Sequence, residues 1–178
     1  MSEQCEVSRV IPAPVQVVFD AWLSSHTHGE MTGSIATYNE ATGEFSAWDG
    51  YISGRTLTTA PPTRVIQSWR STEFPGDAPD SVLEVLFEKA RGGTLVTVKH
   101  SNSPDGQSAS YAQGWNEYYF NPMTRYFAEA APRRPAKTRR SAPKKKAQAK
   151  KRAAKKVTRA KRATRPTRKK AARRTTKR

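Results

Sequence analysis

Cysteine is almost absent from this chain of 178 residues, which contains Cys5 and no other. A single cysteine excludes an intramolecular disulfide and any cysteine-rich zinc site. Long apolar runs are also missing, since no stretch approaches the roughly 18 to 20 apolar residues of a membrane-spanning helix. The N-terminus lacks the basic start, apolar run and cleavage site of a secretory signal peptide. We therefore expect an intracellular protein without a membrane span, in the cytoplasm or nucleoid, or in the nucleus of a eukaryote.

Acidic residues are missing from residues 132–178, which hold 24 Lys and Arg and no Asp or Glu. Because the whole chain has 32 Lys and Arg and 15 Asp and Glu, residues 1–131 keep 8 basic and 15 acidic side chains, a net charge of −7. The last segment also lacks aromatic residues and has one large aliphatic residue, Val157. It cannot bury enough apolar surface to offset the entropy of ordering. The sequence thus predicts a domain over 1–131 and a disordered basic tail over 132–178.

The basic clusters of this tail resemble the C-terminal tails of linker histones and their bacterial counterparts. Each phosphate that a Lys or Arg neutralises releases condensed cations, which gives affinity without base specificity. One alternative is that the charges serve only to keep the protein soluble, but acidic groups serve solubility better. Another is that the tail binds an anionic membrane surface, which would also attract it. We predict binding of DNA or RNA without sequence specificity. The residues expected to contact phosphate are Lys144, Lys145, Lys146, Lys150, Lys151, Arg152, Lys155, Lys156, Arg159, Lys161, Arg162, Arg168, Lys169, Lys170, Arg173 and Arg174.

The N-terminal domain begins with a mixed strand over residues 5–11 and a short helix. Pro14 suits the first helical position, where its missing N–H is not needed. The helix is indicated by apolar residues at helical spacing, Val15, Val18, Phe19 and Trp22.

Strand patterns and turn signals follow from Gly33 to residue 106. Asp49-Gly50 predicts a hairpin, Pro61-Pro62 separates the next two strands, and residues 74–80 read as a loop. Several strands alternate between an apolar and a polar face, which predicts a sheet with one buried side. The inward-facing positions are Val65, Gln67, Trp69, Leu83, Val85, Phe87, Val96, Val98 and His100.

A long aromatic helix over residues 107–130 closes the domain, and Pro122 is expected to kink or divide it. Gly114 lies on the aromatic face, where it would allow a close backbone. Such a helix suits the open apolar face of the sheet, so the fold class is α+β. The aromatic stripe comprises Tyr111, Trp115, Tyr118, Tyr119, Pro122, Met123 and Tyr126.

These elements, in this order, resemble the helix-grip (START-like, SRPBCC) superfamily, and within it the family of the activator of the 90-kDa heat-shock protein ATPase, C-terminal-like domain. The resemblance covers nearly all of residues 5–128. It rests on Ile11-Pro-Ala-Pro14, Val18-Phe-Asp-Ala-Trp22, Met31-Thr-Gly33, Trp48-Asp-Gly50-Tyr-Ile-Ser-Gly54, Gln67-Ser-Trp69-Arg70, the strand Thr94–His100, and Gly114-Trp115-Asn-Glu-Tyr-Tyr-Phe120 followed by Pro122-Met123.

The resemblance implies a curved antiparallel sheet that grips the long helix around an apolar cavity. It also implies one of two roles: docking to a chaperone, or carrying or converting a small hydrophobic molecule. The walls of the implied cavity would come from Phe45, Trp48, Trp69, Leu83, Val85, Phe87, Val98, His100, Trp115 and Tyr119.

Catalytic and metal-binding patterns are weak. No GxSxG motif or phosphate-binding glycine loop is present. His26 and His28 could form a zinc pair with His100, but no carboxylate at fixed spacing accompanies them, and the resemblance places them in a loop. His100 is expected to be a hydrogen-bonded core histidine.

We therefore predict no metal, no cofactor and no enzymatic activity. The predicted function is a helix-grip domain, docking a chaperone or binding a hydrophobic ligand, tethered to nucleic acid by the tail. The alternatives are a co-chaperone whose tail is incidental, and a small-molecule carrier or cyclase-like enzyme.

Overall fold

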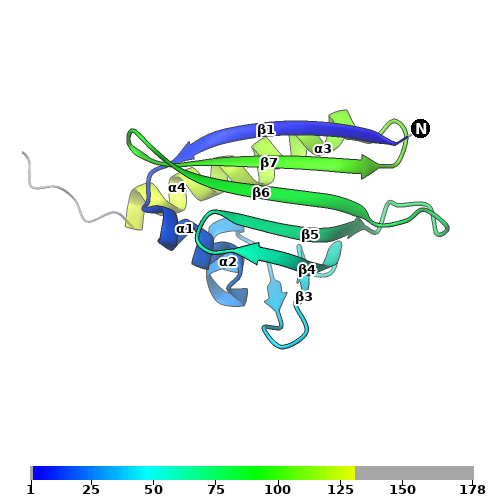
Figure 1. Cartoon of the computed structure of the whole chain (residues 1–178), viewed down its shortest axis with the longest axis horizontal. Coiled ribbons are helices and arrows are strands. Elements are labelled where there is room, and N and C mark those ends of the chain that lie inside the picture. Colours follow the sequence, from blue (N-terminus) through cyan, green and yellow to red (C-terminus); the bar gives the residue numbers. More distant parts are fainter. Residues whose placement is uncertain (1, 131–178) are drawn as a thin grey trace, which may run out of the picture. The chain divides into compact units, whose positions relative to one another are not determined.

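The computed structural model describes residues 2–130, and these build one antiparallel sheet with helices on one of its faces (Figure 1). The strands are β1 (Glu3–Ile11), β2 (Ala36–Tyr38), β3 (Glu44–Ala47), β4 (Ile52–Ala60), β5 (Arg64–Ser71), β6 (Ser81–Ala90) and β7 (Gly93–Ser103). The helical segments are α1 (Val15–Trp22), α2 (Ser25–Thr32), α3 (Ser108–Gly114), η1 (Trp115–Phe120) and α4 (Asn121–Ala130). The predicted disorder and phosphate contacts of residues 132–178 lie outside the described residues.

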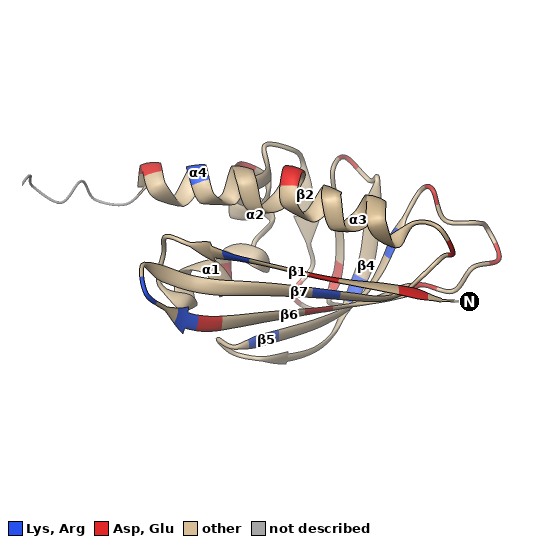
Figure 2. Cartoon of the chain, turned by 90° about the horizontal axis from the view of Figure 1, so that it is seen from above, with Lys and Arg blue, Asp and Glu red and all other residues tan. Residues whose placement is uncertain are grey.

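The sheet has the order β1-β7-β6-β5-β4-β3-β2, so the first strand is placed beside the last one. β1 and β7 pair along their whole length, from Glu3 opposite Ser103 to Ile11 opposite Thr94. The C-terminal helical run α3–η1–α4 lies over one face of this sheet (Figure 2). The α+β prediction of a curved antiparallel sheet with a covering C-terminal helix is confirmed.

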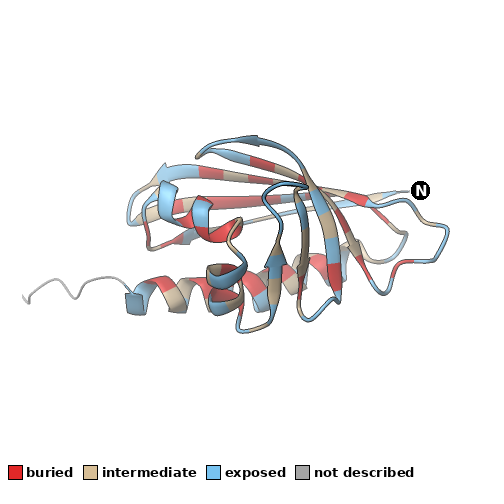
Figure 3. Cartoon of the chain, turned by 90° about the horizontal axis from the view of Figure 1, so that it is seen from below, coloured by how far each residue is buried: buried red, intermediate tan, exposed pale blue. Residues whose placement is uncertain are grey.

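The core lies between the sheet and this helical run, and the alternation of the strands determines which residues enter it. Every second residue of β5, and of β6 as far as Phe87, is buried, including Val65 and Trp69. Buried residues, coloured red, occur along both the strands and the helices (Figure 3). Apolar burial of this kind contributes roughly 25 cal/mol for each Å² removed from water. None of the helices in the described part of the chain is both long and apolar enough to cross a bilayer.

The first two helices differ in detail from the prediction. Pro14 is the N-cap of α1 with an extended backbone, φ −61° and ψ 150°, and helical geometry begins at Val15. His26 and His28 lie in the helix α2 rather than in a loop, so that expectation was wrong. The Ser24 hydroxyl accepts a hydrogen bond from the Thr27 N–H at 3.2 Å, which caps the start of this helix.

The C-terminal helix is continuous in path but changes its winding in the middle. Residues Trp115–Phe120 form a π-helical segment, in which the Asn121 N–H donates to the Asn116 carbonyl, five residues earlier. Pro122 follows directly and has no N–H to give to the ordinary helical carbonyl, so the predicted irregularity is a widened turn. No backbone from another element lies within 4 Å of the position a Gly114 Cβ would take, so a close backbone contact was a wrong expectation.

Candidate functional site

A pocket of about 430 Å³ opens between the β3–β4 hairpin and the first half of the C-terminal helix. Seven of its ten lining residues are aromatic, and none carries a formal charge. The lining consists of Trp48, Tyr51, Ile52, Trp69, Ser110, Tyr111, Gly114, Trp115, Tyr118 and Tyr119. Small-molecule sites are concave, mostly apolar and of this size, so the pocket is the candidate functional site of the described domain.

The hairpin wall depends on an unusual backbone conformation at Trp48. Trp48, Asp49 and Gly50 all have positive φ, at 58°, 54° and 84°. For a bulky residue this conformation is costly, by about 1–3 kcal/mol, and it persists only where the surroundings impose it. The Trp48 ring meets Tyr118 and Tyr119 edge-on, with ring centroids 5.6 and 6.2 Å apart. The strained turn therefore aims an indole ring at the helix.

The helix wall depends on the π-helical segment. Trp115, Tyr118 and Tyr119 all lie in it, and such widened turns occur frequently at functional sites. The rings of Trp115 and Tyr119 lie 4.6 Å apart, and Trp69 of β5 approaches Trp115 at 6.0 Å. Tyr118 is 56% exposed and lies at the mouth, whereas Trp115 and Tyr119 form the floor. Two irregular backbone segments thus face each other across the pocket.

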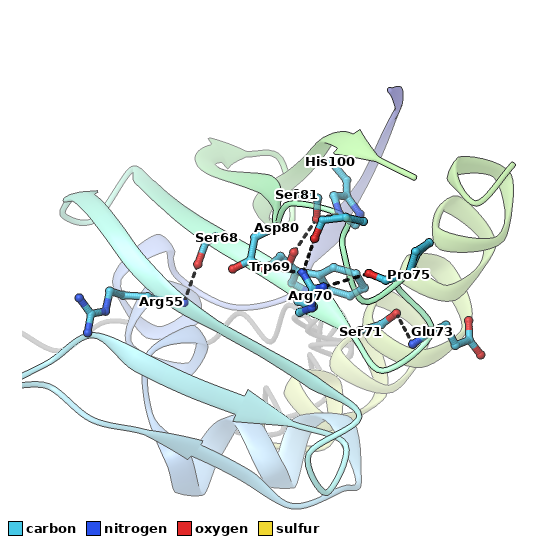
Figure 4. Close-up of polar contacts among 11 residues, drawn as sticks. Arg55, Ser68, Trp69, Arg70, Ser71, Glu73, Pro75, Asp80, Ser81 and His100 are labelled. Carbon is cyan, nitrogen blue, oxygen red and sulfur yellow. Dashed lines mark hydrogen bonds and ion pairs between the residues drawn. The ribbon is translucent and has the colours of Figure 1, made fainter. Parts of the chain in front are cut away.

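One end of the pocket carries a polar network, of which Figure 4 shows the bond between Ser71 and Glu73. The Tyr111 hydroxyl donates to Gln107 Oε1 at 2.6 Å and lies 3.0 Å from Ser71 Oγ. Ser71 Oγ also accepts a hydrogen bond from the Glu73 N–H at 3.2 Å. Burial raises the pKa of Tyr51, and a hydrogen bond to the Glu73 carboxylate raises that pKa further. Burial likewise raises the pKa of Tyr111. A carboxylate therefore stands beside the rim tyrosines.

Arg70 holds the β5–β6 loop that carries Glu73. Its guanidinium donates to the carbonyls of Ala78 and Pro75, at 2.8 and 3.1 Å, and to Asp80 Oδ1 at 2.9 Å (Figure 4). The same group lies 5.5 Å from the centre of the Phe74 ring. With this many partners inside its own loop, Arg70 positions the loop and does not face the pocket.

His100 lies behind the pocket in a fully satisfied hydrogen-bond chain. Trp115 Nε1–H donates to His100 Nδ1 at 3.4 Å, so Nε2 carries the proton and donates to Ser81 Oγ at 2.7 Å. Ser81 in turn donates to the Trp69 carbonyl at 2.7 Å (Figure 4). Burial lowers the pKa of His100 to about 4. This confirms the expectation of a hydrogen-bonded core histidine.

His28 is the second buried histidine. Its Nδ1 lies 2.9 Å from the Trp22 carbonyl, so Nδ1–H is the donor and Nε2 is an unprotonated acceptor. That Nε2 has no hydrogen-bond partner among the described residues. His28 borders an inner cavity of about 20 Å³, roughly the space of one water molecule, behind Trp69, Trp115 and Tyr119. Burial lowers the pKa of His28.

The family model described as "Activator of Hsp90 ATPase homolog 1-like protein" matches residues 12–128. The chain belongs to this family. The human activator of 90 kDa heat shock protein ATPase homolog 1 is 25% identical over 89 residues, which are 50% of this chain and 26% of the human protein. The chain therefore matches about a quarter of the length of that curated relative.

Solved structures show the same fold as this activator-like domain. An HSP90 activator from Plasmodium falciparum superposes with a TM-score of 0.62 at 20% identity, covering 70% of this chain and 96% of that one. CalU16 from Micromonospora echinospora gives 0.59 at 21% identity, covering 70% and 74%. An AHSA1-like protein from Aeromonas hydrophila gives 0.53 at 19% identity, covering 72% and 94%. The predicted helix-grip fold is thereby confirmed.

The activator-like domain divides the ten predicted cavity residues into three groups. Trp48, Trp69, Trp115 and Tyr119 line the main pocket. Phe45 and Leu83 border only the small inner cavity, and the others line neither. These others are fully buried core residues, namely Val85, Phe87, Val98 and His100.

Sequence reasoning missed six lining residues, and it predicted no metal site at the histidines. Of the six, the aromatic stripe had already pointed to Tyr111 and Tyr118, while the hairpin signal could have pointed to Tyr51. His26 Nε2 lies 3.3 Å from Glu30 Oε1 on the exposed side of α2. No group of three or more metal-ligating His, Cys, Asp or Glu side chains occurs within residues 2–130. The remaining lining residues that were missed are Ile52, Ser110 and Gly114.

Proposed function

We propose that this protein is a non-enzymatic binding protein. Its activator-like domain holds a small apolar molecule in the aromatic pocket, and its tail tethers that domain to DNA or RNA. The observation that carries the first part is the pocket of about 430 Å³ with seven aromatic walls. Two irregular backbone segments shape it, the strained turn at Trp48 and the widened turn at Trp115–Phe120, and such segments cluster at functional sites.

The chemistry of the lining supports binding without catalysis. Its titratable groups with shifted pKa values are the tyrosines Tyr51, Tyr111 and Tyr119, and burial raises the pKa of each. A tyrosine shifted in this direction stays protonated near neutral pH and is a poor general base. His28 and His100 are absent from the pocket lining. The pocket therefore offers surface and shape, with no group prepared for proton abstraction.

Ligand binding is tested by a Trp48→Gly substitution in the full chain. Glycine adopts positive φ without strain, so this change removes the ring while it suits the turn. The neutral fluorescent probe N-phenyl-1-naphthylamine should bind the wild type, and Trp48→Gly should weaken that binding about tenfold, through loss of roughly 1.4 kcal/mol of aromatic contact. Val17→Ala, an exposed apolar residue on α1, is the matched control and should leave binding unchanged. Equal affinity of wild type and Trp48→Gly would exclude the pocket as the binding site.

The tethering part is supported by the 24 Lys and Arg of residues 132–178, which no Asp or Glu offsets. Replacing Lys144, Lys145 and Lys146 by Gln in the full chain removes three phosphate contacts. We expect the slope of log affinity against log salt on duplex DNA to flatten by about 2.7, at about 0.9 for each contact. Fluorescence anisotropy over a salt series on two unrelated duplexes measures this. An effect confined to one base sequence would contradict non-specific binding.

Family membership favours a second candidate function, that of a co-chaperone. The human relative is named as an activator of the 90-kDa heat shock protein ATPase, and this chain matches about a quarter of it. The two candidates differ in one readout, the ATP turnover of a 90-kDa heat-shock protein in the presence of the full chain. Stimulation that survives Trp48→Gly would favour docking by the outer surface over ligand binding.

A further inference from the structure

The aromatic rings of the pocket surround its open volume. Neighbouring rings meet at steep angles rather than stacking flat: Trp69 and Tyr111 at 75°, Trp48 and Tyr118 at 72°. A ring face carries partial negative charge and a ring edge partial positive charge. Because three indoles and four phenol rings line one pocket, an occupant meets ring surface from both the hairpin and the helix.

Two of the polar hydrogens of these rings are used inside the protein. The Trp115 N–H donates to His100, and the Tyr111 hydroxyl donates to Gln107. The Trp48 ring meets Tyr119 edge-on, with ring centroids 6.2 Å apart. An anionic ligand needs free donors, and two of the seven rings direct theirs to protein acceptors. The lining therefore offers electron-rich ring faces and no cationic donor.

The charges near the pocket favour a positive occupant. The lining contains no Lys or Arg. Burial and the nearby Glu73 carboxylate raise the pKa of the rim residue Tyr51, while Arg70 is occupied by Asp80 and loop carbonyls. Residues 1–131 carry a net charge of −7. A positive occupant would be attracted to the mouth and a negative one repelled.

Building on the ligand binding proposed above, we infer that the pocket recognises an alkylated ammonium group, such as a quaternary ammonium or N-methylated amine, on an otherwise apolar small molecule. A cation over a tryptophan or tyrosine face gains about 0.5–1 kcal/mol when exposed and about 2 kcal/mol or more when desolvated. Alkylation suits the site because methyl groups need no hydrogen-bond acceptors, whereas a bare ammonium brings three donors into a mostly aromatic lining.

A pair of probes with the same shape tests the inference in the full chain. Choline and 3,3-dimethylbutan-1-ol differ in that the first carries a quaternary nitrogen where the second carries a carbon. Titration followed by the NMR signals of the indole N–H groups should show choline binding about tenfold more tightly, a difference of roughly 1.4 kcal/mol.

The outcomes separate this inference from the proposed function. Equal or tighter binding of the neutral alcohol would overturn the cation inference and leave a ligand pocket. Binding of N-phenyl-1-naphthylamine without any response to choline would do the same. If none of the three probes binds, the proposed ligand-binding function itself fails.

Two matched pairs of variants locate the selectivity. Glu73→Gln should weaken choline binding about threefold, the scale of an exposed charge interaction, without changing the binding of the alcohol. Asp77→Asn in the same loop removes an exposed charge without that tyrosine partner and should change neither. Tyr118→Leu should lower the choline preference, and Tyr118→Phe, which keeps the ring, should retain it. Equal effects of Glu73→Gln and Asp77→Asn would show that choline responds to the overall negative charge of the domain and not to Glu73 in particular.

Discussion

Phe87→Ala should lower the free energy of unfolding of this domain by about 3–5 kcal/mol. Phe87 is 0% exposed and lies at the centre of the core. Its ring meets Phe19 at 5.5 Å and Trp22 at 6.2 Å, both edge-on, so it joins β6 to α1. Removal of the ring costs its transfer free energy and leaves a void that close-packed neighbours fill only in part. Equilibrium unfolding in urea, followed by tryptophan fluorescence, measures the change.

Tyr118→Ala is the control for this prediction. Tyr118 is also a large aromatic residue, but it is 56% exposed at the mouth of the pocket. Surface substitutions of this kind are usually within about 0.5 kcal/mol of the parent protein. A domain of this size has a stability of about 5–15 kcal/mol, so the Phe87 variant should lose a large part of it. Similar losses for the two variants would mean that the core is not organised around β6 and α1.

The domain should also lose about 3 kcal/mol of stability between pH 7 and pH 4 because of His100. Burial lowers the pKa of this residue to about 4 in the folded state, against about 6.5 when unfolded. Between these values the unfolded chain binds a proton that the folded chain does not, so acid favours unfolding. The stabilising effect is complete above pH 6.5 and is lost as the pH falls toward 4. The hydrogen-bond chain agrees, because protonated Nδ1 could no longer accept from Trp115.

His100→Gln removes this titration and should flatten the pH dependence of unfolding between pH 6.5 and 4. The variant is less stable at pH 7, so its slope, measured by urea unfolding at several pH values, is the quantity to compare. His28 is buried with a lowered pKa and contributes in the same direction, which leaves a residual slope. His26→Asn is the matched control, since that side chain is 82% exposed. An unchanged slope in His100→Gln would show that the loss in acid arises elsewhere.

Much of the fold could be predicted because the local signals agree with one another. Alternating burial along β5 and β6 follows the printed pattern of apolar residues, and Asp49-Gly50 forms the turn between β3 and β4. The helix α2 was missed although its signals are local. Ser24 caps it and Gly33 ends it with φ 76°, but its eight residues have no apolar stripe to announce a helix.

The candidate site is where the sequence was insufficient. Inward-facing residues such as Phe87 and Trp69 have the same alternation pattern, and only one of them borders the pocket. The two residues differ in which side chains lie opposite them across the core. Phe19 and Trp22 of α1 fill the space against Phe87. Against Trp69, the hairpin and the helix leave a pocket of about 430 Å³.

The sequence by itself determined the antiparallel sheet, its buried face and the covering aromatic helix. It also determined the contrast between a net charge of −7 over residues 1–131 and +24 over residues 132–178. These features follow from the spacing of apolar residues along each segment and from the charge of each side chain, both of which can be read from the sequence. The tertiary structure decided which rings become core and which become the walls of a pocket. That choice depends on whether a side chain from a distant element fills the space in front of each ring, because a void is a property of the packed assembly and of no single segment.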